Sequence, residues 1–184
     1  FNWVDNMNVL INKFLLFGFI GWFLEIICIS LTKHKLSNNH FLYTPICPMY
    51  GLGGLFISLA ISNISNYLLV FFVAGLIAIT VEYSVSYFME KLFHTRWWDY
   101  SYKKYHINGR ISLTTSIDFG ILGICIKIMD KFLSYNFNYS YLILSIVIID
   151  LIISTIITYR ITNKKKYHNN ILSKYIEFKL SNLP

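Results

Sequence analysis

Charged side chains are scarce in this sequence. Only 14% of its 184 residues are Asp, Glu, Lys or Arg, 55% are hydrophobic, and the mean hydropathy is +0.52. Because soluble domains carry about 25% charged residues, this composition excludes an ordinary soluble enzyme and indicates a membrane protein. The formal net charge of +7 then reflects the side of the membrane that the loops face, and we expect no nucleic-acid partner.

Cysteine and the motifs of nucleotide and metal chemistry are also missing or few. Cys28, Cys47 and Cys125 stand singly in apolar segments, which predicts neither a zinc site nor a disulfide framework. The sequence has no glycine-rich loop ending in Gly-Lys-Ser or Gly-Lys-Thr, no HExxH and no GxSxG. We therefore expect no cofactor and no metal, and energy for any transport has to come from a partner or an ion gradient. The chain also lacks a recognisable signal peptide, so we expect its first hydrophobic segment to direct insertion.

Long hydrophobic runs are abundant. A membrane-spanning helix needs about 20 mostly apolar residues, and four segments reach that length: residues 9–31, 67–89, 111–129 and 140–160. A fifth segment, residues 45–62, is shorter, and its first half holds Pro45, Pro48 and Gly51. Because proline lacks a donor and glycine loosens the backbone, we expect regular helix there only after Gly54. The sequence predicts an all-helical membrane protein with about five transmembrane helices.

The positions of lysine and arginine along the chain predict how it is oriented in the membrane. If the C-terminus is cytoplasmic, every basic residue lies in an inner loop except Lys13, Lys127 and Lys131, as the positive-inside rule requires. A re-entrant loop at residues 45–62 would change the span count. We expect one transmembrane domain over residues 1–163, followed by a basic tail, residues 164–184. The tail is either a short amphipathic helix on the inner membrane face or partly disordered.

Five carboxylates lie inside or at the ends of the predicted spans: Glu25, Glu82, Glu90, Asp118 and Asp150. A charge at mid-membrane costs at least about 2.5 to 3.5 kcal/mol, so the chain has to pair or hydrate these groups. All but Asp150 fall in the predicted cytoplasmic half. We expect either an inward-facing polar site, walled by Glu25, Glu82 and Asp118, or ion pairs that lock three spans together. Asp150, with no cation at its own depth, is expected to face a partner subunit or to carry a proton.

The loop before the span predicted at residues 111–129 combines aromatic and charged residues, in the order Arg96, Trp97, Trp98, Asp99, Tyr100. Trp and Tyr suit the headgroup layer, which predicts an aromatic belt. Arg stacks on indoles and grips carboxylates or phosphates, so the same residues also suit a substrate site.

The end of this loop predicts a turn followed by a cation. Asn108 and Gly109 indicate a tight turn with positive φ. Arg110 then stands at the start of the next span, where a helix N-terminus favours an anion, a phosphate or a carboxylate. In the alternative interpretation, Arg110 is held by Asp99 or Glu90.

These motifs resemble the bacterial CmpB-like family, also described as ABC-transporter type IV. The resemblance covers roughly residues 15–125 and rests on Gly21-Trp22 with Glu25, residues 44–51, Glu82, residues 89–101 and residues 107–111. It implies a permease-like subunit in the cell membrane, whose partner is a separate ATP-binding subunit or a second copy of the chain. The chain departs from the family pattern at Asn39-His40, Thr44 and Phe119.

A permease-like subunit is the favoured function, since residues 91–110 form the one predicted inner loop long enough to reach an ATPase. A membrane enzyme or lipid-handling protein, acting at headgroup level through Glu82, Asp99 and Arg110, is a second hypothesis, although no nucleophile motif accompanies these residues. A non-catalytic membrane partner or sensor is the third.

Overall fold

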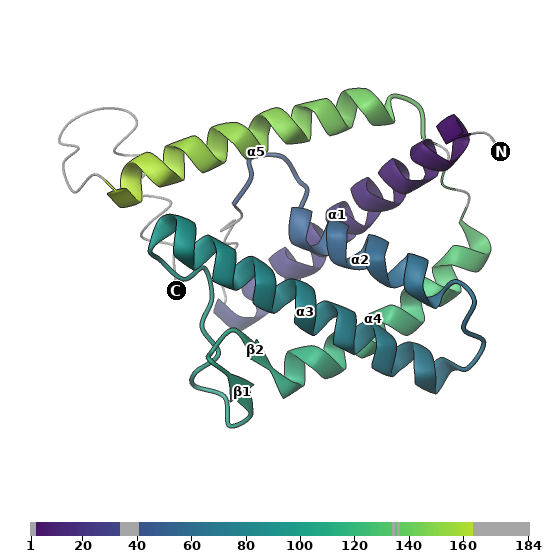
Figure 1. The fold of residues 1–184 in the computed structure, drawn as a ribbon, viewed down its shortest axis with the longest axis horizontal. Helices are drawn as coiled ribbons and strands as arrows, with labels where there is room; N and C mark the ends of the chain where they lie inside the picture. The colour runs from purple at the N-terminus through teal and green to yellow at the C-terminus, as the bar shows by residue number, and fades with distance from the viewer. Residues whose placement is uncertain (1–2, 34–40, 134, 136, 164–184) are drawn as a thin grey trace.

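Five helices of alternating direction form the described part of the chain (Figure 1). The computed structural model describes residues 3–33, 41–133, 135 and 137–163. The helices are α1 (Trp3–Lys33), α2 (Pro48–Ile61), α3 (Tyr67–Phe93), α4 (Leu113–Phe132) and α5 (Ser140–Asn163). A small antiparallel hairpin, β1 (His106–Ile107) and β2 (Ile111–Ser112), lies between α3 and α4. This confirms the predicted fold class, whereas the predicted tail, residues 164–184, lies outside the described residues.

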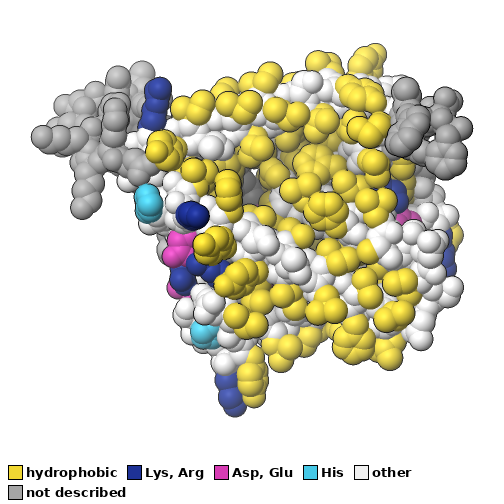
Figure 2. Space-filling model, in the orientation of Figure 1, with side chains coloured by type: hydrophobic (Ala, Val, Ile, Leu, Met, Phe, Trp, Pro, Cys, Tyr) yellow, Lys and Arg dark blue, Asp and Glu magenta, His cyan; other side chains and the backbone are white. Residues whose placement is uncertain are grey.

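The surface is that of a membrane-embedded protein. Three helical segments are long and apolar enough to cross a bilayer, namely Met7–Cys28, Tyr67–Phe93 and Ser140–Arg160. The apolar helix α2 has 14 residues and is about 21 Å long at 1.5 Å per residue, less than the roughly 30 Å of a hydrocarbon core. Figure 2 shows hydrophobic side chains over the middle of one face and charged side chains at its two ends.

The helix ends gather on two sides. In Figure 1, the C-terminal ends of α1, α3 and α5 and the hairpin lie toward the left, whereas the start of α1 and the α2–α3 and α4–α5 connections lie toward the right. The loops are therefore grouped as the orientation argument assumes. Which side faces the cytoplasm stays a prediction.

Helix α2 is short, as expected, but it begins earlier than predicted. It starts at Pro48 and not after Gly54. The N–H groups in the first turn of a helix have no partner within the helix, so a proline there removes no hydrogen bond, and its fixed φ suits the helix. The irregular backbone ends before it, in residues 41–47, which include Pro45. The glycines of α2 do not break the helix. They let it approach α1, since a Cβ on Gly54 would lie 2.7 Å from Phe17.

Buried apolar side chains form two clusters. The larger cluster joins the four helices α1, α2, α3 and α4 and the α4–α5 connection. It comprises Phe17, Ile57, Ile61, Val70, Ala74, Ala78, Ile126 and Tyr135. The smaller joins α1, the segment 41–47 and α5 through Ile11, Leu15, Leu42, Ile46 and Val147. Since lipid tails are as apolar as these side chains, close packing and polar contacts have to hold the helices together.

Helix α5 is fastened by Asp150. One carboxylate oxygen accepts hydrogen bonds from the backbone N–H groups of Tyr43 (2.9 Å) and Thr44 (2.7 Å) and from the Thr44 hydroxyl (2.8 Å). Ser154 donates to the other oxygen at 3.2 Å. The expectation that Asp150 faces a partner subunit was therefore wrong. Its partners are amides of its own chain, left unpaired because residues 41–47 are not helical.

Two glycines offer a matched test of the α1–α2 contact. A Cβ on Gly21 would collide with Tyr50, whereas a Cβ on Gly53 would meet no heavy atom within 4 Å. We expect Gly21→Ala to destabilise the fold by about 1–3 kcal/mol through overpacking. Gly53→Ala is expected to be neutral or stabilising by up to about 1 kcal/mol, because alanine favours helix. Thermal unfolding in detergent, followed by tryptophan fluorescence, measures both, and equal midpoints would contradict the packing argument.

Candidate functional site

Residues 94–112, here called the capping segment, cover the end of α3 and the start of α4. His94 ends α3 in the left-handed conformation, with φ of 55°. Asn108 (φ 52°) and Gly109 (φ 67°) form a tight turn, closed by the Arg110 N–H donating to the Ile107 carbonyl at 3.0 Å. This confirms the predicted turn. Gly109 also has no room for a side chain, since a Cβ would collide with the Asp99 carboxylate.

Glu90 is the anchor of the capping segment. One of its oxygens lies 2.9 Å from Nε of Arg96 and 2.8 Å from Nη1 of Arg110. The buried Arg110 also donates to Ser86 at 3.3 Å, and its guanidinium lies over the ring of Tyr87, 5.5 Å from the centroid. Of the two roles considered for Arg110, the structure shows the ion pair with Glu90.

The two tryptophans have different surroundings. The Trp98 indole N–H donates to the Arg110 carbonyl at 2.9 Å, which ties the two arms of the capping segment together. The Trp97 ring packs edge-on against Phe41, with centroids 5.2 Å apart, and near Phe93 at 6.0 Å. Trp97 therefore packs the segment against the end of α3 and against Phe41, whereas Trp98 holds the segment together internally.

Asp99 and Tyr100 point in different directions. Asp99 is exposed and accepts hydrogen bonds from the Ser101 hydroxyl (2.6 Å) and N–H (2.8 Å), which hold the pKa of its carboxyl below the ordinary value. Tyr100 is turned inward, and its hydroxyl donates to Oε1 of Glu82 at 3.1 Å. Burial, followed by the charge of Glu82, raises the pKa of Tyr100 above its ordinary value, so the phenol stays protonated and remains a donor.

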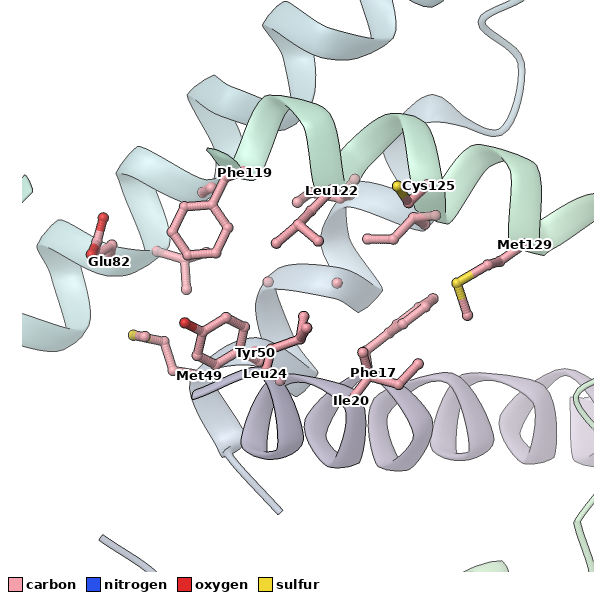
Figure 3. A pocket seen from close by; sticks show the side chains of 17 residues that line it. Phe17, Ile20, Leu24, Met49, Tyr50, Glu82, Phe119, Leu122, Cys125 and Met129 are labelled. Atoms are coloured by element: carbon pink, nitrogen blue, oxygen red, sulfur yellow. The ribbon is translucent and has the colours of Figure 1, made fainter. Parts of the chain in front are cut away.

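A cavity of about 80 Å³ lies between α1, α2, α3 and α4 (Figure 3). Glu82, Tyr50 and Phe119 lie toward one end, and Phe17 and Met129 toward the other. The rest of its lining is largely apolar: Ile20, Gly21, Leu24, Met49, Gly53, Gly54, Ile57, Ala78, Val81, Leu122, Cys125 and Ile126.

Glu82 is the one carboxylate in this lining. Its side chain is buried, with 3% of the residue exposed. Oε1 is bound by Tyr100, but Oε2 has no hydrogen-bond partner among the described residues. Within the same residues, no three His, Cys, Asp or Glu side chains are grouped as a metal site would require.

The predicted walls of the site are only partly brought together. Glu25 on α1 lies within electrostatic reach of Tyr50 and Tyr100, so it approaches the same end as Glu82. Asp118 does not line the cavity. It is exposed on α4, and its neighbour Phe119 lines the cavity instead, because successive helical residues point about 100° apart. The backbone-shaping Gly51 lies against Phe14 of α1.

A second polar cluster lies just beyond the other end of the cavity, and sequence reasoning missed it. Lys13 lies 3.0 Å from Asp130 and donates to the Ser58 hydroxyl at 2.6 Å. Ser58 and Tyr135 also donate to Asp130, at 2.7 and 2.5 Å. Ser58 and Asp130 follow the cavity residues Ile57 and Met129 directly. Asp130 was missed because, next to Lys131, it resembled an ordinary loop charge after the predicted span.

The two arginines bound to Glu90 differ in exposure, which gives a test of the cluster. The Arg110 side chain is 11% exposed and that of Arg96 is 35% exposed. We expect Arg110→Gln to lower stability by about 1–3 kcal/mol, since it removes a largely buried charge from its partner. Arg96→Gln should cost less than about 1 kcal/mol, because its pair is screened by solvent. Equal shifts in the thermal unfolding midpoint would show that burial does not set the strength of this cluster.

Comparison with known proteins identifies the family. The sequence pattern of the family described as "Putative ABC-transporter type IV" matches residues 12–163. The match includes the capping segment, the cavity and both polar clusters, and it confirms the resemblance that the motifs indicated. No curated protein and no solved structure matches the chain. The chain therefore belongs to the ABC-transporter type IV family of membrane proteins.

Proposed function

We propose that this protein is the permease-like membrane subunit of an ABC-type transporter and that the four-helix cavity is its substrate site. The observation that carries this proposal is the hydrogen bond from Tyr100 to Glu82, at 3.1 Å. It joins a segment at the surface of the protein to the one carboxylate in the cavity lining. A displacement of the capping segment would thus change the substrate site directly.

The position of the cavity supports a transport role. It lies between the Glu82–Tyr100 pair at one end and the Lys13–Asp130 cluster at the other. A transporter needs a central site that each end can open in turn. Polar contacts suit such ends, since water that enters when an end opens can take the place of the lost partner.

The capping segment supplies a surface for an ATP-binding partner. Its tip exposes Tyr102 (80%), Tyr105 (62%) and Ile107 (59%), here called the docking surface. Glu90 of α3 holds Arg110 of the segment, and Ser112 caps the start of α4, so a force applied at the tip is passed to the helices. The sequence has no nucleotide-binding loop, and the proposal therefore requires a separate ATP-binding subunit on the cytoplasmic side.

The enzyme hypothesis has less support. It requires Glu82, Asp99 and Arg110 at one headgroup-level site. Asp99 is exposed, Arg110 is paired with Glu90, and Glu82 lines the cavity. A purely structural partner or sensor has no need of a buried carboxylate oxygen without a partner. The permease proposal accounts both for the position of Glu82 in the cavity lining and for its oxygen without a partner.

Site-specific cross-linking tests the docking surface. A photo-reactive amino acid in place of Tyr105 is expected to capture a protein that binds ATP, detected by labelling with an azido-ATP analogue. The matched control is the same amino acid in place of Tyr139, which is 77% exposed and lies next to α5 at the opposite side. Capture from Tyr139 alone, or of no ATP-binding protein from Tyr105, would contradict the proposed arrangement.

Removal of one hydroxyl tests the link between the docking surface and the cavity. Tyr100→Phe is expected to leave ATP hydrolysis by the complex intact and to lower transport about tenfold, since a hydrogen bond to a charged group contributes about 1.5–3 kcal/mol. Tyr159→Phe, at an exposed position on α5, is the control and should change neither activity. Uptake and ATP hydrolysis in proteoliposomes measure both quantities. Full transport by Tyr100→Phe would exclude this hydrogen bond as the coupling element.

A further inference from the structure

We propose that the Glu82 end of the cavity binds a small organic ammonium cation with apolar substituents, of about the size of trimethylammonium. This inference rests on the proposed function in one respect: it names the class of substrate that the proposed permease would carry. Binding itself requires no ATP-binding subunit and can be tested separately.

Three other acids in the helices have clear partners. Glu90 is paired with Arg110, Asp130 with Lys13, and Asp150 accepts two backbone N–H groups. Among the described residues, Glu82 has no such ion pair, and its Oε2 has no hydrogen-bond donor. A buried carboxylate in that condition is costly, and a bound cation would offset the cost.

The rest of the lining selects the kind of cation. Hard divalent ions need six or more oxygen ligands, whereas the lining residues near this end offer one free carboxylate oxygen and the Tyr50 hydroxyl. Apolar and aromatic side chains make up most of the lining. A cation whose own surface is apolar loses less hydration there than an inorganic ion does.

Aromatic rings add an attraction for such a cation. The rings of Tyr50 and Phe119 are tilted by 45°, with centroids 5.7 Å apart, and both line the cavity. In Figure 3 the Tyr50 hydroxyl points toward the end where Glu82 lies. Aromatic faces next to a carboxylate are a common arrangement for recognising alkylated ammonium groups.

The size of the cavity limits the ligand. An apolar cavity of about 150 Å³ admits benzene, so one of about 80 Å³ admits only a few heavy atoms. Trimethylammonium meets this limit. The headgroup of phosphatidylcholine carries a closely related quaternary ammonium group with three methyl substituents, and the experiment has to distinguish the free cation from the lipid.

The test is binding to the full-length protein in a maltoside detergent at neutral pH. Trimethylammonium chloride is expected to bind saturably, measured by calorimetry and by a rise in the thermal unfolding midpoint. tert-Butanol, of similar shape and without charge, should not bind at the same concentrations. Vesicles or nanodiscs of phosphatidylcholine form the second arm. Protection by the free cation, by the lipid, or by both supports the site and identifies the source of the ammonium group.

Three variants assign the binding to the cavity. Glu82→Gln, whose amide oxygen still accepts from Tyr100, is expected to weaken binding at least tenfold, and Phe119→Leu several-fold. Asp118→Asn removes a negative charge from the exposed residue next to Phe119 on α4. This variant should bind the cation as the native protein does. If Glu82→Gln fails to fold, Phe119→Leu carries the test.

Three results would overturn the inference: no binding to the native protein, equal binding of tert-butanol, or native affinity in both Glu82→Gln and Phe119→Leu. None of these would affect the cross-linking result at Tyr105. A failed ammonium site and a failed permease assignment are therefore distinguishable.

Discussion

A bilayer gives buried charges and unpaired backbone groups no water to bind, so the chain has to supply their partners itself. Asp150 meets this constraint with the amides of Tyr43 and Thr44, and the same contact holds α5 to the irregular segment before α2. Glu90 meets it with two arginines, and the result is a capping segment with a fixed position. Apolar contacts alone would hold neither arrangement, since lipid tails compete with them.

Glu82 departs from this pattern, which is why the cavity stands out from the other packing in the structure. Tyr100, which belongs to the capping segment, donates to one of its oxygens, and its second oxygen has no donor among the described residues. The lining around it is small and mostly apolar. The proposed substrate site and the proposed coupling path therefore share Glu82, so a change in one also alters the other.

Much of the fold follows from local features of the sequence. The apolar runs predicted where the long helices lie, although α1 begins at Trp3 and not at residue 9, and α4 is not among the segments apolar enough to cross a bilayer. Asn108-Gly109 predicted a turn for the local reason that both residues tolerate positive φ. The start of α2 was misjudged, because proline has opposite effects inside a helix and in its first turn. Only the position of Pro48 in the first turn of α2 decides between them.

The sequence by itself determined a basic, all-helical membrane protein of the ABC-transporter type IV family, with charged and aromatic residues grouped near residues 82–110. Tertiary structure decided which of these groups meet. It brought Glu82 to Tyr100, turned Asp118 outward, and brought together Lys13 and Asp130, which are 117 residues apart. Hydropathy reports the depth of a residue and little about its direction around the helix. Rotation by about 100° per residue and the packing of glycines against neighbouring helices set that direction, and both depend on the assembled fold.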